Sequence, residues 1–151
     1  DIMLWLEDEY SAACGRSARR TTHPQFTRRR MENYKLVMPG DLNPHGYLFG
    51  GKLLMWVDEY AYIGAKLDFP DCRLVTIALD NVEFRKSIQQ GTVLKFVVSR
   101  SRLGKTSVQY TVDVLNSVDP SGGSMFMTVV TYVRVDESGA KQPLPEPVSV
   151  A

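Results

Sequence analysis

The feature that most constrains the fold is one long helical segment followed by several segments of β character. Residues 51–67 form the only long helix candidate, which the Asp-Phe-Pro that follows brings to an end. Lys52, Glu59 and Lys66 recur every seventh position, so they lie along one narrow stripe that faces solvent. Apart from Asp58, the rest of this helix is apolar or small. Such a helix must be buried on its broad face.

The segments after the helix alternate as strands do. They lie at about residues 73–85, 92–102, 106–117 and 124–135, and a short β-prone segment at 34–37 precedes the helix. The third segment alternates apolar with polar residues, which is typical of a sheet with one face exposed to solvent. The last segment is apolar on both faces, which suits a central strand. This order predicts an α+β fold in which a curled antiparallel sheet wraps one long central helix. The free edge of such a sheet predicts a homodimer.

Segments of different composition flank the expected domain. Residues 1–30 are rich in Arg and poor in core-forming residues, which predicts a disordered N-terminal extension. The folded domain is expected over residues 31–138. Residues 139–151 contain three prolines and predict an extended C-terminal tail.

Composition excludes several classes of protein. A formal net charge of +1 is too small for non-specific binding of nucleic acid, so we expect no DNA or RNA partner. No run of about 18 apolar residues is present, which excludes a membrane span. Cys14 and Cys72 belong to no CxxC pair and there are only two His, so we expect no metal site and a reducing cytoplasm.

Asp58 is the main candidate for a catalytic group. Its helical neighbours are apolar: Leu54, Met55, Ala61, Tyr62 and Ala65. A carboxylate on an apolar flank is costly unless it has a partner or a purpose, and it suits a general base. The alternative is an exposed boundary acid, or an acid that forms a salt bridge with Arg73 or Arg85.

The segment HGYLFGG, residues 45–51, leads into the helix. Gly50 and Gly51 let a substrate approach the free N–H groups of the helix start, where the dipole favours developing negative charge. They form a candidate oxyanion hole, or they only permit tight packing at the helix entry. His45 either polarises a carbonyl or forms a hydrogen bond within its loop.

The segment VMPGDLNPHGYLFGGKLLMWVDEYA, residues 37–61, resembles the opening of the hotdog-fold acyl-CoA thioesterases, with their MPxDxNxxGxxFGGxLLxxxD pattern. The resemblance continues through VTIALDNVEF, QQGTVL and RLGKTSVQYTVDV and covers roughly residues 34–136. It implies that the protein hydrolyses acyl-CoA to a fatty acid and CoA. Asp58 would activate a water or attack the thioester carbonyl directly, while the N–H of Gly50 or Gly51 holds the oxyanion.

The resemblance also implies how the substrate is held. We expect Asn43, Phe49 and Phe84 to contact it, and Arg102 and Lys105 to bind the CoA phosphates. No cofactor is implied, since CoA is part of the substrate. The family forms dimers with sites at the subunit interface, which predicts a homodimer and a hexamer made of three dimers.

Two other functions have support in the sequence. GDLNPHG is nearly the GDxNPxH signature of the R-specific enoyl-CoA hydratases, another hotdog branch, in which Asp41 and His45 would be the catalytic pair. One residue is missing between Pro and His, and the FGG with Asp58 follows the thioesterase pattern. The third hypothesis is a non-catalytic hotdog dimer that binds acyl-CoA, because a fold alone does not determine an activity.

Overall fold

The chain runs from a strand to a helix and then to four strands. The computed structural model describes residues 29–148, with β1 (Arg30–Leu36), α1 (Gly50–Asp68), β2 (Leu74–Phe84), β3 (Val93–Leu103), β4 (Ser107–Asn116) and β5 (Ser124–Arg134). Two 3-10 turns, η2 (Pro39–Asp41) and η3 (Pro120–Gly122), lie in the connections. The helix and the last four strands match the predicted segments to within one residue at each end. β1 is the exception, because it begins at Arg30 and not near residue 34.

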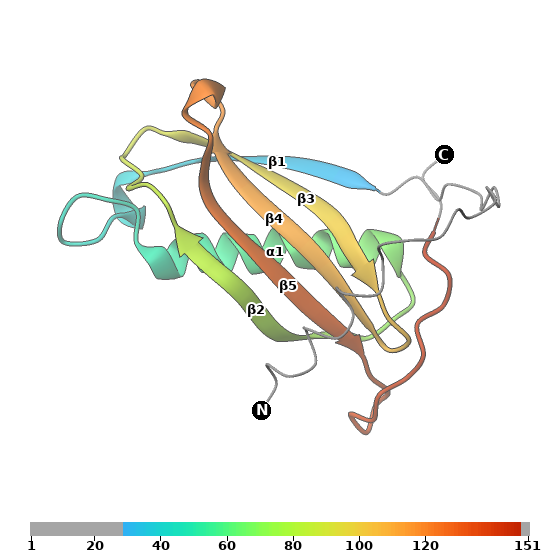
Figure 1. Ribbon diagram of the computed structural model, residues 1–151. Coiled ribbons are helices and arrows are strands. Elements are labelled where there is room, and N and C mark those ends of the chain that lie inside the picture. The colour runs from blue at the N-terminus through green and yellow to red at the C-terminus, as the bar shows by residue number, and fades with distance from the viewer. Residues whose placement is uncertain (1–28, 149–151) are drawn as a thin grey trace, which may run out of the picture.

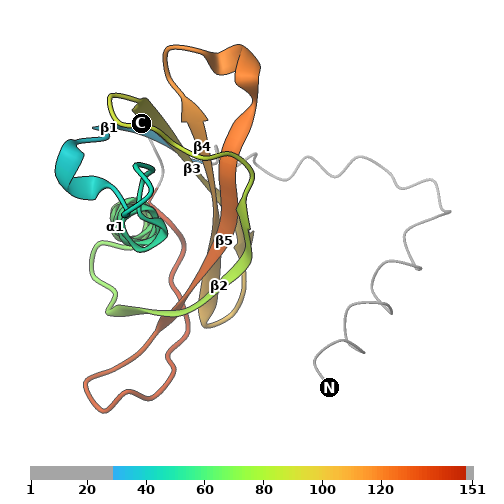
Figure 2. The same ribbon diagram turned by 90° about the vertical axis from the view of Figure 1, so that its left-hand side faces the viewer.

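The five strands form one antiparallel sheet in the order β1-β3-β4-β5-β2. Figure 1 shows α1 lying across this sheet, and in Figure 2 the curled sheet is seen with the helix on its concave side. β1 and β2 are the two edge strands, and β5 lies inside the sheet as its two apolar faces predict. The predicted α+β fold with a helix wrapped by a sheet is confirmed.

The core lies between α1 and the concave face of the sheet. On the helix, the buried apolar residues are Leu53, Trp56, Val57, Ala61 and Ala65. On β4, the alternation resolves as predicted: Val108, Tyr110, Val112 and Val114 are buried. Burial of these side chains is the main stabilising contribution, at roughly 25 cal/mol per Å² of apolar surface removed from water.

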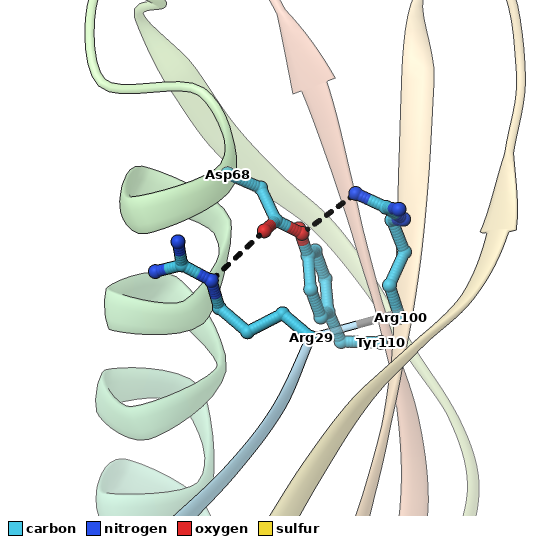
Figure 3. A network of polar contacts seen from close by, with 4 residues as sticks. All are labelled: Arg29, Asp68, Arg100 and Tyr110. Atoms are coloured by element: carbon cyan, nitrogen blue, oxygen red, sulfur yellow. Dashed lines mark hydrogen bonds and ion pairs between the residues drawn. The ribbon is translucent and has the colours of Figure 1, made fainter. Parts of the chain in front are cut away.

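A buried ionic network fixes the C-terminal end of α1 to the sheet (Figure 3). The Asp68 carboxylate is 1% exposed; Oδ2 accepts hydrogen bonds from Arg100 Nη1 at 2.9 Å and from the Tyr110 hydroxyl at 2.7 Å. Arg29 Nε lies 3.4 Å from Oδ1. An acid at a helix C-terminus opposes the helix dipole, and the two guanidinium groups offset both that effect and the burial of the charge.

The two ends of the expected domain can now be compared with the structure. The ion pair of Arg29 and the start of β1 at Arg30 extend the ordered unit slightly beyond the expected start at residue 31. The rest of the expected N-terminal extension lies outside the described residues. Towards the other end, residues 142–148 contain no helix or strand, and the N–H of Val148 bonds to the Asp68 carbonyl at 2.9 Å. Between residues 29 and 148, no helix has the length and apolar character needed to cross a membrane.

Candidate functional site

Asp58 is held by donors from two strands of the sheet. Its Oδ1 accepts hydrogen bonds from Thr76 Oγ1 on β2 at 3.0 Å and from the Tyr132 hydroxyl on β5 at 3.1 Å. Oδ2 accepts none from the residues that the structure describes. No basic side chain between residues 29 and 148 pairs with Asp58, and Arg85 instead pairs with Glu83 at 2.8 Å. The salt-bridge alternative therefore fails for Arg73 and Arg85, and one carboxylate oxygen stays available for chemistry.

Local backbone geometry brings the two donors to Asp58. The pairing of β2 with β5 is irregular between Thr76 and Ala78, and a bulge of this kind resets which side chains face the helix. Tyr132 is fully buried on the helix-facing side of β5. Burial, and then the charge of Asp58, raise the pKa of Tyr132, so its hydroxyl stays protonated and remains a donor. Sequence reasoning did not identify either donor, because the bulge and the pairing across strands leave no local signal.

The N-terminus of α1 exposes two free backbone donors. Phe49 is the N-cap in an extended conformation, and its carbonyl accepts from the N–H groups of Lys52 at 2.9 Å and Leu53 at 3.2 Å. The N–H groups of Gly50 and Gly51 have no acceptor among residues 29–148. Such unpaired N–H groups at a helix start are suited to a developing oxyanion.

Both glycines also satisfy a packing requirement. A Cβ on Gly50 would lie 3.2 Å from the Phe84 ring, and a Cβ on Gly51 would lie 2.7 Å from the Phe49 ring. The two interpretations of this glycine pair, as an oxyanion hole and as a close-packed helix entry, therefore do not exclude each other. The predicted residues Phe49 and Phe84 lie directly beside the helix start.

The loop before α1 is held by its own side chains. Asn43 Oδ1 accepts from the backbone N–H groups of His45 at 2.9 Å and Tyr47 at 3.1 Å. Asp41 Oδ2 accepts from the Met38 N–H at 2.9 Å. The His45 side chain is exposed and bonds to neither Asp41 nor any other described residue. The hydrogen bond that ties His45 to its loop is thus made by its backbone N–H and not by its side chain, and the Asp41–His45 side-chain contact that a hydratase would need is absent from the described part of the chain.

A pocket of about 440 Å³ opens beside the start of α1. Its lining is apolar at Leu48, Leu53, Phe84 and Ile88 and polar at Asn43, Arg85, Lys86 and Ser87, with Tyr47 and Gly50 completing it. Three residues predicted from sequence, Asn43, Gly50 and Phe84, thus meet in one cavity. Its two basic residues, Arg85 and Lys86, place cationic groups on the wall of the cavity.

Arg102 and Lys105 lie elsewhere in the chain. They are exposed at the β3–β4 hairpin, close to Arg100, which binds Asp68 at the C-terminal end of α1. The pocket lies at the opposite end of this 19-residue helix, which is about 28 Å long at 1.5 Å per residue. Figure 1 shows the β3–β4 hairpin towards the C-terminal end of α1, away from the helix start that lines the pocket.

Asp58 and the free glycine N–H groups are also separated within one chain. Gly50 and Asp58 are eight positions apart on α1, which corresponds to about 12 Å along the helix axis. An oxyanion donor must lie about 3 Å from the carbonyl oxygen, and a general base must reach the carbonyl directly or through one water. Within one chain, the Asp58 backbone and the Gly50 N–H group therefore lie well apart along α1.

The chain is similar to known acyl-CoA thioester hydrolases in sequence and in structure. Residues 45–122 match the thioesterase superfamily. An uncharacterized acyl-CoA thioester hydrolase of Haemophilus influenzae is 32% identical over 115 residues, which are 73% of this chain and 74% of the relative. A Staphylococcus aureus acyl-CoA hydrolase, solved with butyryl-CoA and CoA, superposes with a TM-score of 0.69 at 28% identity over 78% of this chain and 72% of its own. A hexameric Yersinia pestis thioesterase gives 0.67 at 30% identity over 76% and 93%.

Proposed function

Because the chain belongs to the thioesterase superfamily, we propose that it hydrolyses the thioester bond of acyl-CoA to a free acid and CoA. Relatives and structural neighbours of this chain are acyl-CoA thioester hydrolases. The observation that carries the proposal is the arrangement of Asp58, whose Oδ1 is fixed by two donors while Oδ2 accepts no hydrogen bond from residues 29–148. A carboxylate held in this way is suited to a general base or a nucleophile.

The chemistry needs few groups. Asp58 removes a proton from water as the water oxygen attacks the thioester carbonyl, or its carboxylate attacks first and water then hydrolyses the resulting anhydride. The N–H of Gly50 or Gly51 holds the negative charge that develops on the carbonyl oxygen, aided by the dipole of α1. CoA leaves as a thiolate, so the site has little need of a strong general acid.

We infer that each site is shared between two subunits. The separation of about 12 Å along α1 is long for Asp58 and Gly50 of one chain to act on one carbonyl, whereas a two-fold symmetric pair can present Asp58 of one subunit to Gly50 of the other. β2 is an edge strand, and it carries exposed apolar side chains such as Ile77 and Phe84. The Yersinia pestis neighbour is a hexamer, and we propose three such dimers for this protein as well.

Variants of the Staphylococcus aureus hydrolase give this assignment further support. Solved structures of that enzyme include alanine variants of an asparagine, an aspartate and a threonine. The asparagine and aspartate are 15 positions apart, the same spacing as Asn43 and Asp58. The threonine follows the aspartate by 17 positions, and here Thr76 follows Asp58 by 18. We therefore propose that Asn43, Asp58 and Thr76 act in the same site.

The pocket residues suggest how the substrate is bound. Phe49 and Phe84 pack at the helix start where the thioester must lie. Arg85 and Lys86 on the pocket wall offer cationic groups to the CoA phosphates. Arg102 and Lys105 can take this role only from a neighbouring subunit. A reducing cytoplasm remains our proposed compartment, and Cys72 is buried and unpaired.

The test is release of CoA thiol from a series of short to long acyl-CoAs, followed with a thiol-reactive dye. Wild type is compared with Asp58→Asn and with the matched control Asp41→Asn. We expect Asp58→Asn to abolish release and Asp41→Asn to retain most of it. Hydration of crotonyl-CoA that is lost in Asp41→Asn, without thiol release from any substrate, would instead identify a hydratase.

A further inference from the structure

The Tyr132 hydroxyl contacts two oxygen atoms of Asp58. The Tyr132 hydroxyl lies 3.1 Å from the Asp58 carboxylate Oδ1 and 3.0 Å from the Asp58 backbone carbonyl. One donor shared between the carbonyl and the carboxylate of the same residue fixes the side-chain torsions of that residue relative to the helix. Thr76, at 3.0 Å from the same Oδ1, fixes the carboxylate from the other strand.

We propose that Tyr132 is a positioning residue for Asp58: its hydroxyl fixes Oδ1 against the sheet so that Oδ2 faces the thioester. This inference rests on the proposed function. Tyr132 itself is fully buried, and its ring packs edge to face against Tyr62, one turn beyond Asp58 on α1, at 5.9 Å between ring centroids. This packing fixes the position of the Tyr132 ring and therefore of its hydroxyl.

The surroundings of Asp58 leave few other groups that could perform this task. Thr76 faces it from β2 and Tyr132 from β5, and the adjacent acid on the helix, Glu59, is exposed. No ion pair reaches Asp58 from residues 29–148. A base misplaced by about 1 Å can lose about 100-fold in rate, so fixing one oxygen is sufficient to influence turnover.

The chain offers a matched control for this role. Tyr110, on β4, is also buried, lies 6.2 Å from Tyr132 between ring centroids, and donates its hydroxyl to an aspartate on the same helix. Its acceptor is Asp68, which Arg100 and Arg29 also hold at the far end of α1 (Figure 3). Removing either hydroxyl deletes one buried donor to a carboxylate of α1, but only Tyr132 serves Asp58.

The experiment measures kcat, KM and the pH dependence of kcat/KM for Tyr132→Phe and Tyr110→Phe, with Asp58→Asn as the inactive reference. Urea unfolding of the same preparations gives the folded fraction, to which each rate is normalised. We expect Tyr132→Phe to lower kcat about tenfold with KM changed less than about twofold. The pH dependence of its kcat/KM should differ from that of wild type, because Oδ1 of the base loses the hydrogen bond from Tyr132.

Tyr110→Phe should keep the wild-type kcat and pH profile while losing stability. A Tyr132→Phe enzyme with the wild-type kcat and pH profile, or one whose changes are matched by Tyr110→Phe, would overturn the positioning role. An Asp58→Asn enzyme that retained thiol release would overturn the proposed mechanism instead. The two failures therefore give different results.

Discussion

Replacing Asp68 by Asn tests whether the network at the end of α1 is structural. The carboxylate is 1% exposed and bonds to Arg100, which is 8% exposed, so the substitution leaves a buried guanidinium without its counter-charge. Removing one partner of a buried pair typically costs about 3–5 kcal/mol. The amide oxygen of Asn can still accept the Tyr110 hydrogen bond. We therefore expect the free energy of unfolding to fall by about 3 kcal/mol, the lower end of this range.

Asp58→Asn is the matched control on the same helix. The amide oxygen of the new side chain would keep both acceptor contacts, with Thr76 and Tyr132, and no basic group would lose its partner. We expect a change in the free energy of unfolding within about 0.5 kcal/mol, or a slight gain, since a charged group leaves a half-buried site. The two isosteric changes should therefore differ by at least about 2 kcal/mol in stability.

The assay is urea unfolding of all three proteins at one fixed protomer concentration, because subunit association contributes to apparent stability. A loss of about 3 kcal/mol also corresponds to a fall in Tm of about 6–12 °C for a chain of this size. If Asp68→Asn were as stable as wild type, Arg100 and Arg29 would have to be hydrated and the network would be no structural anchor.

Three further predictions follow from the core, the buried tyrosines and the pocket. Val112→Asp places a charge at a fully buried position of β4, so the variant should not fold; a cooperative, native-like thermal melt would contradict the packing. Burial is the main cause that raises the pKa of Tyr110 and Tyr132 above the ordinary value of 10.0. The free energy of unfolding should therefore be constant below about pH 10 and should fall as pH rises above it, because only the unfolded chain then ionises these tyrosines. Urea unfolding across this range tests the prediction, and a constant free energy of unfolding would refute it. Arg85→Ala should raise the KM for acyl-CoA about three- to tenfold with kcat unchanged, and a KM equal to that of wild type would exclude this residue from phosphate binding.

The sequence predicted most of the fold because its periodicities are local. The helical pattern of residues 51–67 and the alternation from Val108 to Val114 depend only on which side chains face the core, and both are confirmed. The sequence predicts β1 only from residue 34, because Arg30, Glu32 and Tyr34 are exposed on an edge strand and give a weak apolar pattern. Helices and strands are therefore predictable from sequence where one face is buried, and the prediction is less accurate where a strand is largely exposed.

The site was predictable only in part. Asp58 and the glycine pair carry local signals, an acid on an apolar flank and a helix start without side chains. Thr76 and Tyr132 reach Asp58 across a bulged strand pairing, which no local pattern reveals. Arg102 and Lys105 are predicted from the family resemblance and their charge, but the hairpin that bears them lies at the end of α1 away from the pocket.

The central claim, a site shared by two subunits, is tested most directly by complementation. Asp58→Asn removes the base, and Gly50→Pro removes one helix-start N–H. The extended Phe49 before it suits proline, but a Cβ at this position lies 3.2 Å from the Phe84 ring, so this exposed ring must shift slightly. Each variant alone should be inactive or lose about 100- to 1,000-fold in kcat. A purified hetero-oligomer carrying both should recover about half of the wild-type activity, since one of the two sites in each mixed dimer would combine an intact Asp58 with an intact Gly50. If mixing restored no thiol release, both groups would have to act within one chain, and the shared site would be wrong.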